Sequence, residues 1–117
     1  MINFTTRFAA HPTDVTKYDT AQLREHFLIE NLFTENAVEL VYTHYDRLII
    51  GGVKPVDKEA SLETFVSLKS NYFLERREIG IINVGATGTV KADGVTFTLQ
   101  HKEALYLGRG TKEVIFT

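Results

Sequence analysis

The stretch TVKADGVTFTL, residues 89–99, decides the fold class. Two runs rich in β-prone residues, 89–92 and 95–99, flank the dipeptide Asp93-Gly94. A two-residue hairpin turn needs positive φ at both central positions, and Asp and Gly tolerate that conformation. The stretch therefore predicts an antiparallel hairpin.

Further short β-prone runs lie on both sides of this hairpin. The predicted strands are residues 38–43, 47–50, 53–56, 78–84, 104–107 and 113–116. We expect Gly51-Gly52 to end the second of these strands, whereas residues 61–70 fit neither the helical nor the strand period. About seven short strands with glycine turns between them indicate an antiparallel sandwich or barrel.

One helix is predicted near the N-terminus. Asp19 has the character of an N-cap, and Gln22 follows it with the spacing of a capping box, so a helix is expected over residues 20–30. Residues 1–18 are polar and mixed, and we expect either an arm that lies on another element or a poorly ordered start. The predicted division is an N-terminal arm, 1–18, and a barrel, 19–117.

Composition limits the classes of function. The 117 residues fit one domain, and the net charge of -2 gives no electrostatic footprint for nucleic acid. The chain has no Cys, which excludes a disulfide framework, a thiolate zinc site and a cysteine nucleophile. We see no signal peptide and no membrane-spanning apolar stretch, so the expected location is cytoplasmic.

Few residues form a pattern of catalytic or binding chemistry. The four His form no HxH or HExxH arrangement, and His44 is either a general base or ligand, or a partly exposed histidine at a strand end. In the cluster at 75–78, Arg76 and Arg77 are candidates for holding the carboxylate of a sugar acid. The alternative is a solvated strand end or an ion-pair network at a subunit interface.

Residues 72–113 resemble the two-motif layout of the cupin family. Glu78 and the glycine seven residues later keep the first motif's spacing, but Tyr72 and Leu74 stand at its two His positions. Residues 108–113 keep the second motif's spacing, with Glu113 in place of His. The resemblance implies a mainly β, cupin-type double-stranded β-helix (a jelly-roll barrel) with one short N-terminal helix. Since Tyr and Leu cannot replace imidazole at a transition metal, we expect no metal in this barrel.

A closer resemblance rests on the segment YFLERREIGIINVG, residues 72–85. Together with residues 27–30, 42–47 and 112–116, it resembles the 5-keto-4-deoxyuronate isomerases, also called 4-deoxy-L-threo-5-hexosulose-uronate ketol-isomerases. The resemblance covers residues 19–116. The related 5-deoxyglucuronate isomerase is a more distant alternative.

The resemblance to this family implies the N-terminal half of a bicupin about twice as long, and the chain's end directly after a predicted strand is an unusual place for a natural terminus. The family's zinc, held by three His and a Glu, would lie in the C-terminal barrel, and those ligands have no matching positions here. The implied reaction is an aldose–ketose isomerisation of a uronate from pectin breakdown through an enediol.

For this segment, we expect no catalytic residue, no activity in isolation, and a role in barrel packing and assembly of a homo-oligomer, a hexamer in the family. The alternative is a small sugar-acid-binding cupin module in which Arg76 or Arg77 pairs with the ligand carboxylate.

Overall fold

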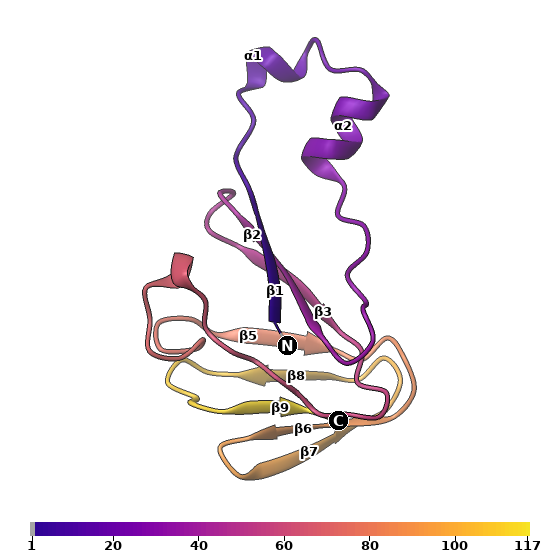
Figure 1. Ribbon diagram of the computed structural model, residues 1–117, viewed down its shortest axis with the longest axis vertical. Coiled ribbons are helices and arrows are strands. Elements are labelled where there is room, and N and C mark those ends of the chain that lie inside the picture. Colours follow the sequence, from indigo (N-terminus) through magenta and orange to yellow (C-terminus); the bar gives the residue numbers. More distant parts are fainter. Residues whose placement is uncertain (1) are drawn as a thin grey trace.

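The computed structural model describes residues 2–117, and these residues form a mainly β structure. Figure 1 shows the strands in the lower part of the molecule and two helices projecting above them. This confirms the β-rich fold class, whereas the cupin-type barrel stays a prediction. Within the described residues, no helix is long and apolar enough to cross a membrane.

The first sheet contains β1 (Ile2–Arg7), β2 (Val38–Thr43) and β3 (Ile49–Val53), in that order. β2 confirms the predicted strand at 38–43, and β1 was not predicted. β1 runs parallel to β2 over its whole length, so that part of the predicted arm lies in the sheet as a strand. β2 and β3 are antiparallel.

The remaining strands are antiparallel and belong to two further sheets. One has the order β4-β9-β6-β7, and the other pairs β5 with β8. Their bounds are β4 (Ala60–Ser61), β5 (Ile79–Ile82), β6 (Gly88–Ala92), β7 (Val95–Leu99), β8 (Ala104–Leu107) and β9 (Val114–Phe116). The predicted hairpin is confirmed, since Asp93 (φ 46°) and Gly94 (φ 86°) form the turn between β6 and β7.

Gly51 and Gly52 do not end a strand, as the sequence predicted, but lie inside β3. At Gly52 an added Cβ would lie 2.9 Å from the Leu32 Cβ and against the Leu32 carbonyl. Gly52 therefore allows the close approach of the chain before β2 and does not mark the end of a strand. The strand predicted at 53–56 is also wrong, because Val53 ends β3 and Lys54 makes only an isolated bridge to Glu35.

The helices are short and bury no residue. α2 (Thr20–Phe27) begins at Asp19 with the predicted capping box and ends three residues before the predicted end at 30. α1 (Pro12–Val15), which was not predicted, is capped by the His11 side chain. The ambiguous stretch 61–70 contains the end of β4 and a 3₁₀ turn, η1 (Val66–Leu68).

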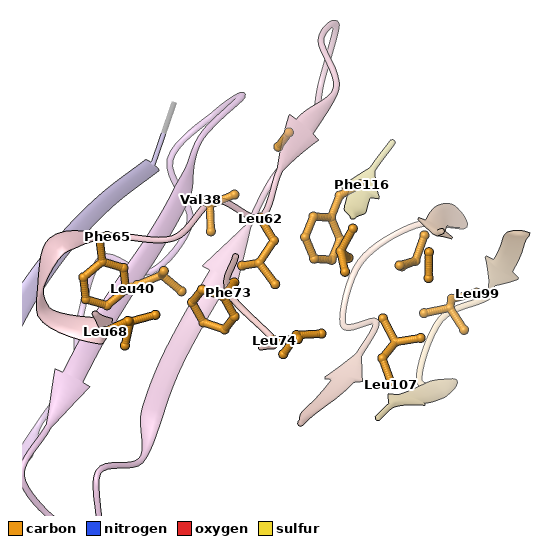
Figure 2. Packing of buried hydrophobic residues seen from close by; sticks show 14 residues of the cluster. Val38, Leu40, Leu62, Phe65, Leu68, Phe73, Leu74, Leu99, Leu107 and Phe116 are labelled. Carbon is orange, nitrogen blue, oxygen red and sulfur yellow. The ribbon is translucent and has the colours of Figure 1, made fainter. Parts of the chain in front are cut away.

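A single apolar cluster joins the sheets. Figure 2 shows Val38, Leu40, Phe65 and Leu68 at the first sheet, and Leu99, Leu107 and Phe116 at the other two. Leu62, Phe73 and Leu74 lie between these groups, and Leu74 is only 1% exposed. The segment before β5, which carries Phe73 and Leu74, thus links the two groups of core residues. The same segment also carries the predicted site residues.

Candidate functional site

Arg76 fastens the segment before β5 to the 3₁₀ turn. Its Nη2 donates to the carbonyls of Leu68 (3.0 Å) and Lys69 (2.5 Å). Lys69 has a positive φ of 50°, which turns the chain at the end of η1. A guanidinium is well suited to this role because its donors are rigidly held and always charged.

Arg77 reaches the first sheet. Its Nη1 donates to the carbonyl of Arg47 (2.8 Å), which lies in the turn between β2 and β3. The guanidinium carbon also lies 5.5 Å from the centre of the Tyr42 ring, a cation–π geometry. Arg77 therefore connects the segment before β5 to both the turn and the face of the first sheet.

The two glutamates of the cluster also bind close neighbours. The Glu75 carboxylate accepts from the backbone N–H (2.9 Å) and the side-chain amide (3.1 Å) of Asn71. Glu78 Oε2 accepts from the Tyr106 hydroxyl at 2.5 Å, between the segment before β5 and strand β8. This hydrogen bond, with loss of water and the charge of Glu78, raises the pKa of Tyr106 above its ordinary value of 10.0.

The side chains of the cluster at 75–78 thus hold neighbouring segments of the chain in place through hydrogen bonds. Ion pairs in the described residues lie elsewhere: Arg24 pairs with Glu30, and Lys54 with Glu35. Both arginines are engaged with backbone carbonyls, so binding of a substrate carboxylate by Arg76 or Arg77 stays a prediction.

The structure brings the two cupin motif segments together without forming a donor set. The Gly110 N–H donates to the Leu74 carbonyl (2.7 Å), so the second motif's turn lies against the first motif. The Leu74 side chain, at one of the His positions, fills the core and offers no donor. Among residues 2–117, no three His, Cys, Asp or Glu side chains are grouped as metal ligands.

The residues at these positions therefore do not fit a zinc ion. Glu78 is hydrogen-bonded to a tyrosine, Tyr72 is half-buried, Glu113 is exposed, and Leu74 is buried between the sheets. An aliphatic side chain in an apolar core supplies neither the nitrogen nor the oxygen that zinc requires.

Asp93 has a structural role beyond the predicted turn. Its Oδ1 accepts from the N–H groups of Lys112 (3.0 Å) and Glu113 (2.9 Å). One side chain thereby fixes the hairpin turn and the start of β9. An Asp in a turn is the only feature of the sequence that could have suggested this role. Its partners lie about 20 residues further along the chain, so no local pattern identifies them.

Each of the four histidines contacts a different neighbour. His44 is exposed just beyond β2, stacked on Phe8 (4.7 Å between ring centres), which agrees with the interpretation of a strand-end histidine. His26 stacks on Tyr18 (4.7 Å), and His101 Nδ1 lies 2.9 Å from the Gly85 carbonyl. With His11 capping α1, these contacts account for all four.

Comparison with known proteins identifies a family of relatives, although no protein-family model matches the chain. The chain is 51% identical over 113 residues to the 4-deoxy-L-threo-5-hexosulose-uronate ketol-isomerase of Formosa agariphila. This match covers 97% of this chain and 40% of that protein. The chain is similar to the uronate ketol-isomerases over nearly its whole length. The ketol-isomerase of Bacillus licheniformis is 50% identical over 111 residues, with 95% of this chain and 40% of that protein covered.

A third relative has the same extent of match. Ketol-isomerase 1 of Bacteroides thetaiotaomicron is 51% identical over 114 residues, 97% of this chain and 41% of that protein. The comparisons confirm the predicted resemblance to this isomerase family. They also show that the chain spans about two-fifths of the length of the curated ketol-isomerases it matches, which fits the prediction that it corresponds to one portion of a longer enzyme.

Proposed function

We propose that this chain forms part of a 4-deoxy-L-threo-5-hexosulose-uronate ketol-isomerase. The reaction would convert 5-dehydro-4-deoxy-D-glucuronate to 3-deoxy-D-glycero-2,5-hexodiulosonate in pectin degradation, in the cytoplasm. The observation that carries the proposal is about 50% identity to such isomerases across 95–97% of the chain.

Within that enzyme, the segment would be a scaffold and not the reacting centre. Its sheets would belong to a degenerate cupin-type jelly-roll barrel whose ligand positions do not fit a metal, so zinc would be held by residues outside this chain. The support is local: Leu74 is part of the apolar core, and Arg76 and Arg77 hold loop carbonyls. Its contribution would be rigid packing and assembly of a homo-oligomer.

A segment replacement tests this proposal. In the Bacillus licheniformis ketol-isomerase, the matched segment is replaced by this chain, and turnover of the 5-dehydro-4-deoxyuronate and bound zinc are measured. We expect the chimera to retain activity and its full zinc content, whereas the 117-residue chain alone converts no substrate. A folded chimera without activity, or turnover by the isolated chain, contradicts the proposal.

A matched variant separates the scaffold role from a metal role. Glu78→Gln in the chimera removes the one residue that keeps a cupin ligand identity, but it preserves side-chain shape. We expect the zinc content and the turnover to stay unchanged. Loss of zinc in this variant would place a metal ligand in this segment and overturn the scaffold role.

A further inference from the structure

β7 is the free edge of the sheet β4-β9-β6-β7. Figure 1 shows it as the outermost strand at the lower end of the molecule. Its two-residue turn makes Ala92 and Val95 a hydrogen-bonded pair, so the alternation of the ladder directs the N–H and C=O groups of Thr96 and Thr98 away from β6. In the part of the chain that the structure describes, these groups have no backbone partner outside the β6–β7 ladder.

This edge lacks the features that keep a free strand from pairing. Protected edges carry Lys, Pro, a bulge or an inward charge. The strand VTFTL has no charged residue, no Pro and no Gly, and it pairs with β6 in an unbroken register. Such an edge is a template for another strand.

The apolar face of β7 is also incompletely covered. Val95 and Phe97 lie on the same face as Ala92 and Val90 of β6, their cross-strand partners. The β6 residues are buried, whereas Val95 is 56% and Phe97 36% exposed. The core thus thins out at β7, and a further strand beside it would continue the apolar layer.

We propose that β7 pairs with β7 of a second copy of this chain, antiparallel about a two-fold axis through Phe97. In this register Thr96 of each copy faces Thr98 of the other, which joins the free N–H and C=O groups of both residues in ladder hydrogen bonds. Val95 faces Leu99 of the second copy, and the two Phe97 side chains meet at the axis. Apolar residues face apolar residues and threonines face threonines, so the strand is complementary to itself.

The charges that flank β7 fit the same arrangement. The antiparallel register brings the turn Asp93-Gly94 of one copy to the turn after β7 of the other, which carries His101 and Lys102. Both carboxylates in these turns are occupied within their own copy, Asp93 with the N–H groups of Lys112 and Glu113 and Glu103 with the Gln100 N–H (2.8 Å), so neither stands unpaired against the other copy. No like charges are opposed along the paired strands, because β7 carries none.

A single introduced cysteine tests the register, since the chain has no Cys of its own. At a non-hydrogen-bonded pair the two Cα atoms lie about 4.5 Å apart, within the range of a disulfide. We expect Phe97→Cys to form disulfide-linked dimers under mild oxidation. Val95→Cys is the matched control, because two copies of residue 95 would lie four residues apart, about 13 Å, which is beyond disulfide reach.

Association itself is measured on the unaltered chain. We expect sedimentation to show a dimer that dissociates on dilution, and Thr96→Pro to shift the chain to monomer. Proline at this position removes an N–H that points away from β6, so the hairpin itself is kept. A wild-type chain that stays monomeric across the concentration series, or equal cross-linking at positions 95 and 97, overturns the proposal. Neither result depends on isomerase activity.

Discussion

The side chains at and near the cupin ligand positions act on neighbours within this chain. Arg76 and Arg77 bind backbone carbonyls, Leu74 fills the core, and Glu78 accepts a hydrogen bond from Tyr106. Glu78 lies just before β5 and Tyr106 on β8, diagonally across the pair Gly80↔Tyr106. Diagonal neighbours in a sheet are within reach of long side chains, so the bond follows from the strand register.

The Tyr106 phenol provides a pH test of this contact. The pKa of Tyr106 is raised in the folded chain. The hydrogen bond therefore contributes its full stabilisation of the fold at pH values below the unfolded-state pKa near 10.0. That stabilisation is lost as the pH rises from this value through the folded-state pKa. The difference in phenolate absorbance between the wild type and Tyr106→Phe should therefore titrate above pH 10.0. Glu78→Gln should lower the midpoint, and a midpoint at or below 10.0 in the wild type would contradict the hydrogen bond.

At the scale of elements, the sequence predicted structure where the signal is local. The capping box at Asp19 and the Asp93-Gly94 turn are fixed by residues within three positions of one another, and both were found. β1 was missed although Ile2 and Phe4 alternate with polar residues, because its partner is 36 positions away. The sequence predicted that Gly51-Gly52 ends a strand, because the close approach of Gly52 to Leu32 is not visible in the sequence.

Gly52→Ala tests the close approach at β3. The new Cβ would meet Leu32 backbone and Cβ atoms, which cannot swing away as a side-chain end does. We expect a loss of about 1–3 kcal/mol in the free energy of unfolding, measured by urea denaturation. Gly80→Ala in β5 is the matched control, since an added Cβ there meets nothing within 4 Å, and its effect should stay within about 0.5 kcal/mol. Equal losses in both variants would contradict the packing explanation.

At the scale of the whole molecule, the chain is more extended than a compact domain. The radius of gyration is 15.6 Å, against about 13 Å for a compact domain of this length. The helices project without burying a residue, and many large apolar side chains are exposed. The candidate-site residues were predictable as a cluster, but their roles were not, because each depends on which distant segment the core places beside it.

Leu74 is the residue on which this core depends most directly. It is the most completely buried large side chain and lies between the first sheet and the other two. We expect Leu74→Ala to cost about 2–5 kcal/mol in the free energy of unfolding at fixed protein concentration, followed by circular dichroism in urea.

Val66→Ala, at a side chain that is 68% exposed, is the control for Leu74→Ala, and should change stability by less than about 0.5 kcal/mol. A small effect at Leu74 would mean that the sheets do not share one core.

The parallel pairing of β1 with β2 has a consequence for the order of folding. β2 and β3 are joined by a short turn and pair at little entropic cost. Pairing of Ile2 with Val38, in contrast, closes a loop that contains both α1 and α2. Closing that longer loop costs more conformational entropy, and the β2 edge must exist before β1 has anything to pair with. β1, which precedes its partner β2 in the chain, is therefore among the last strands to dock.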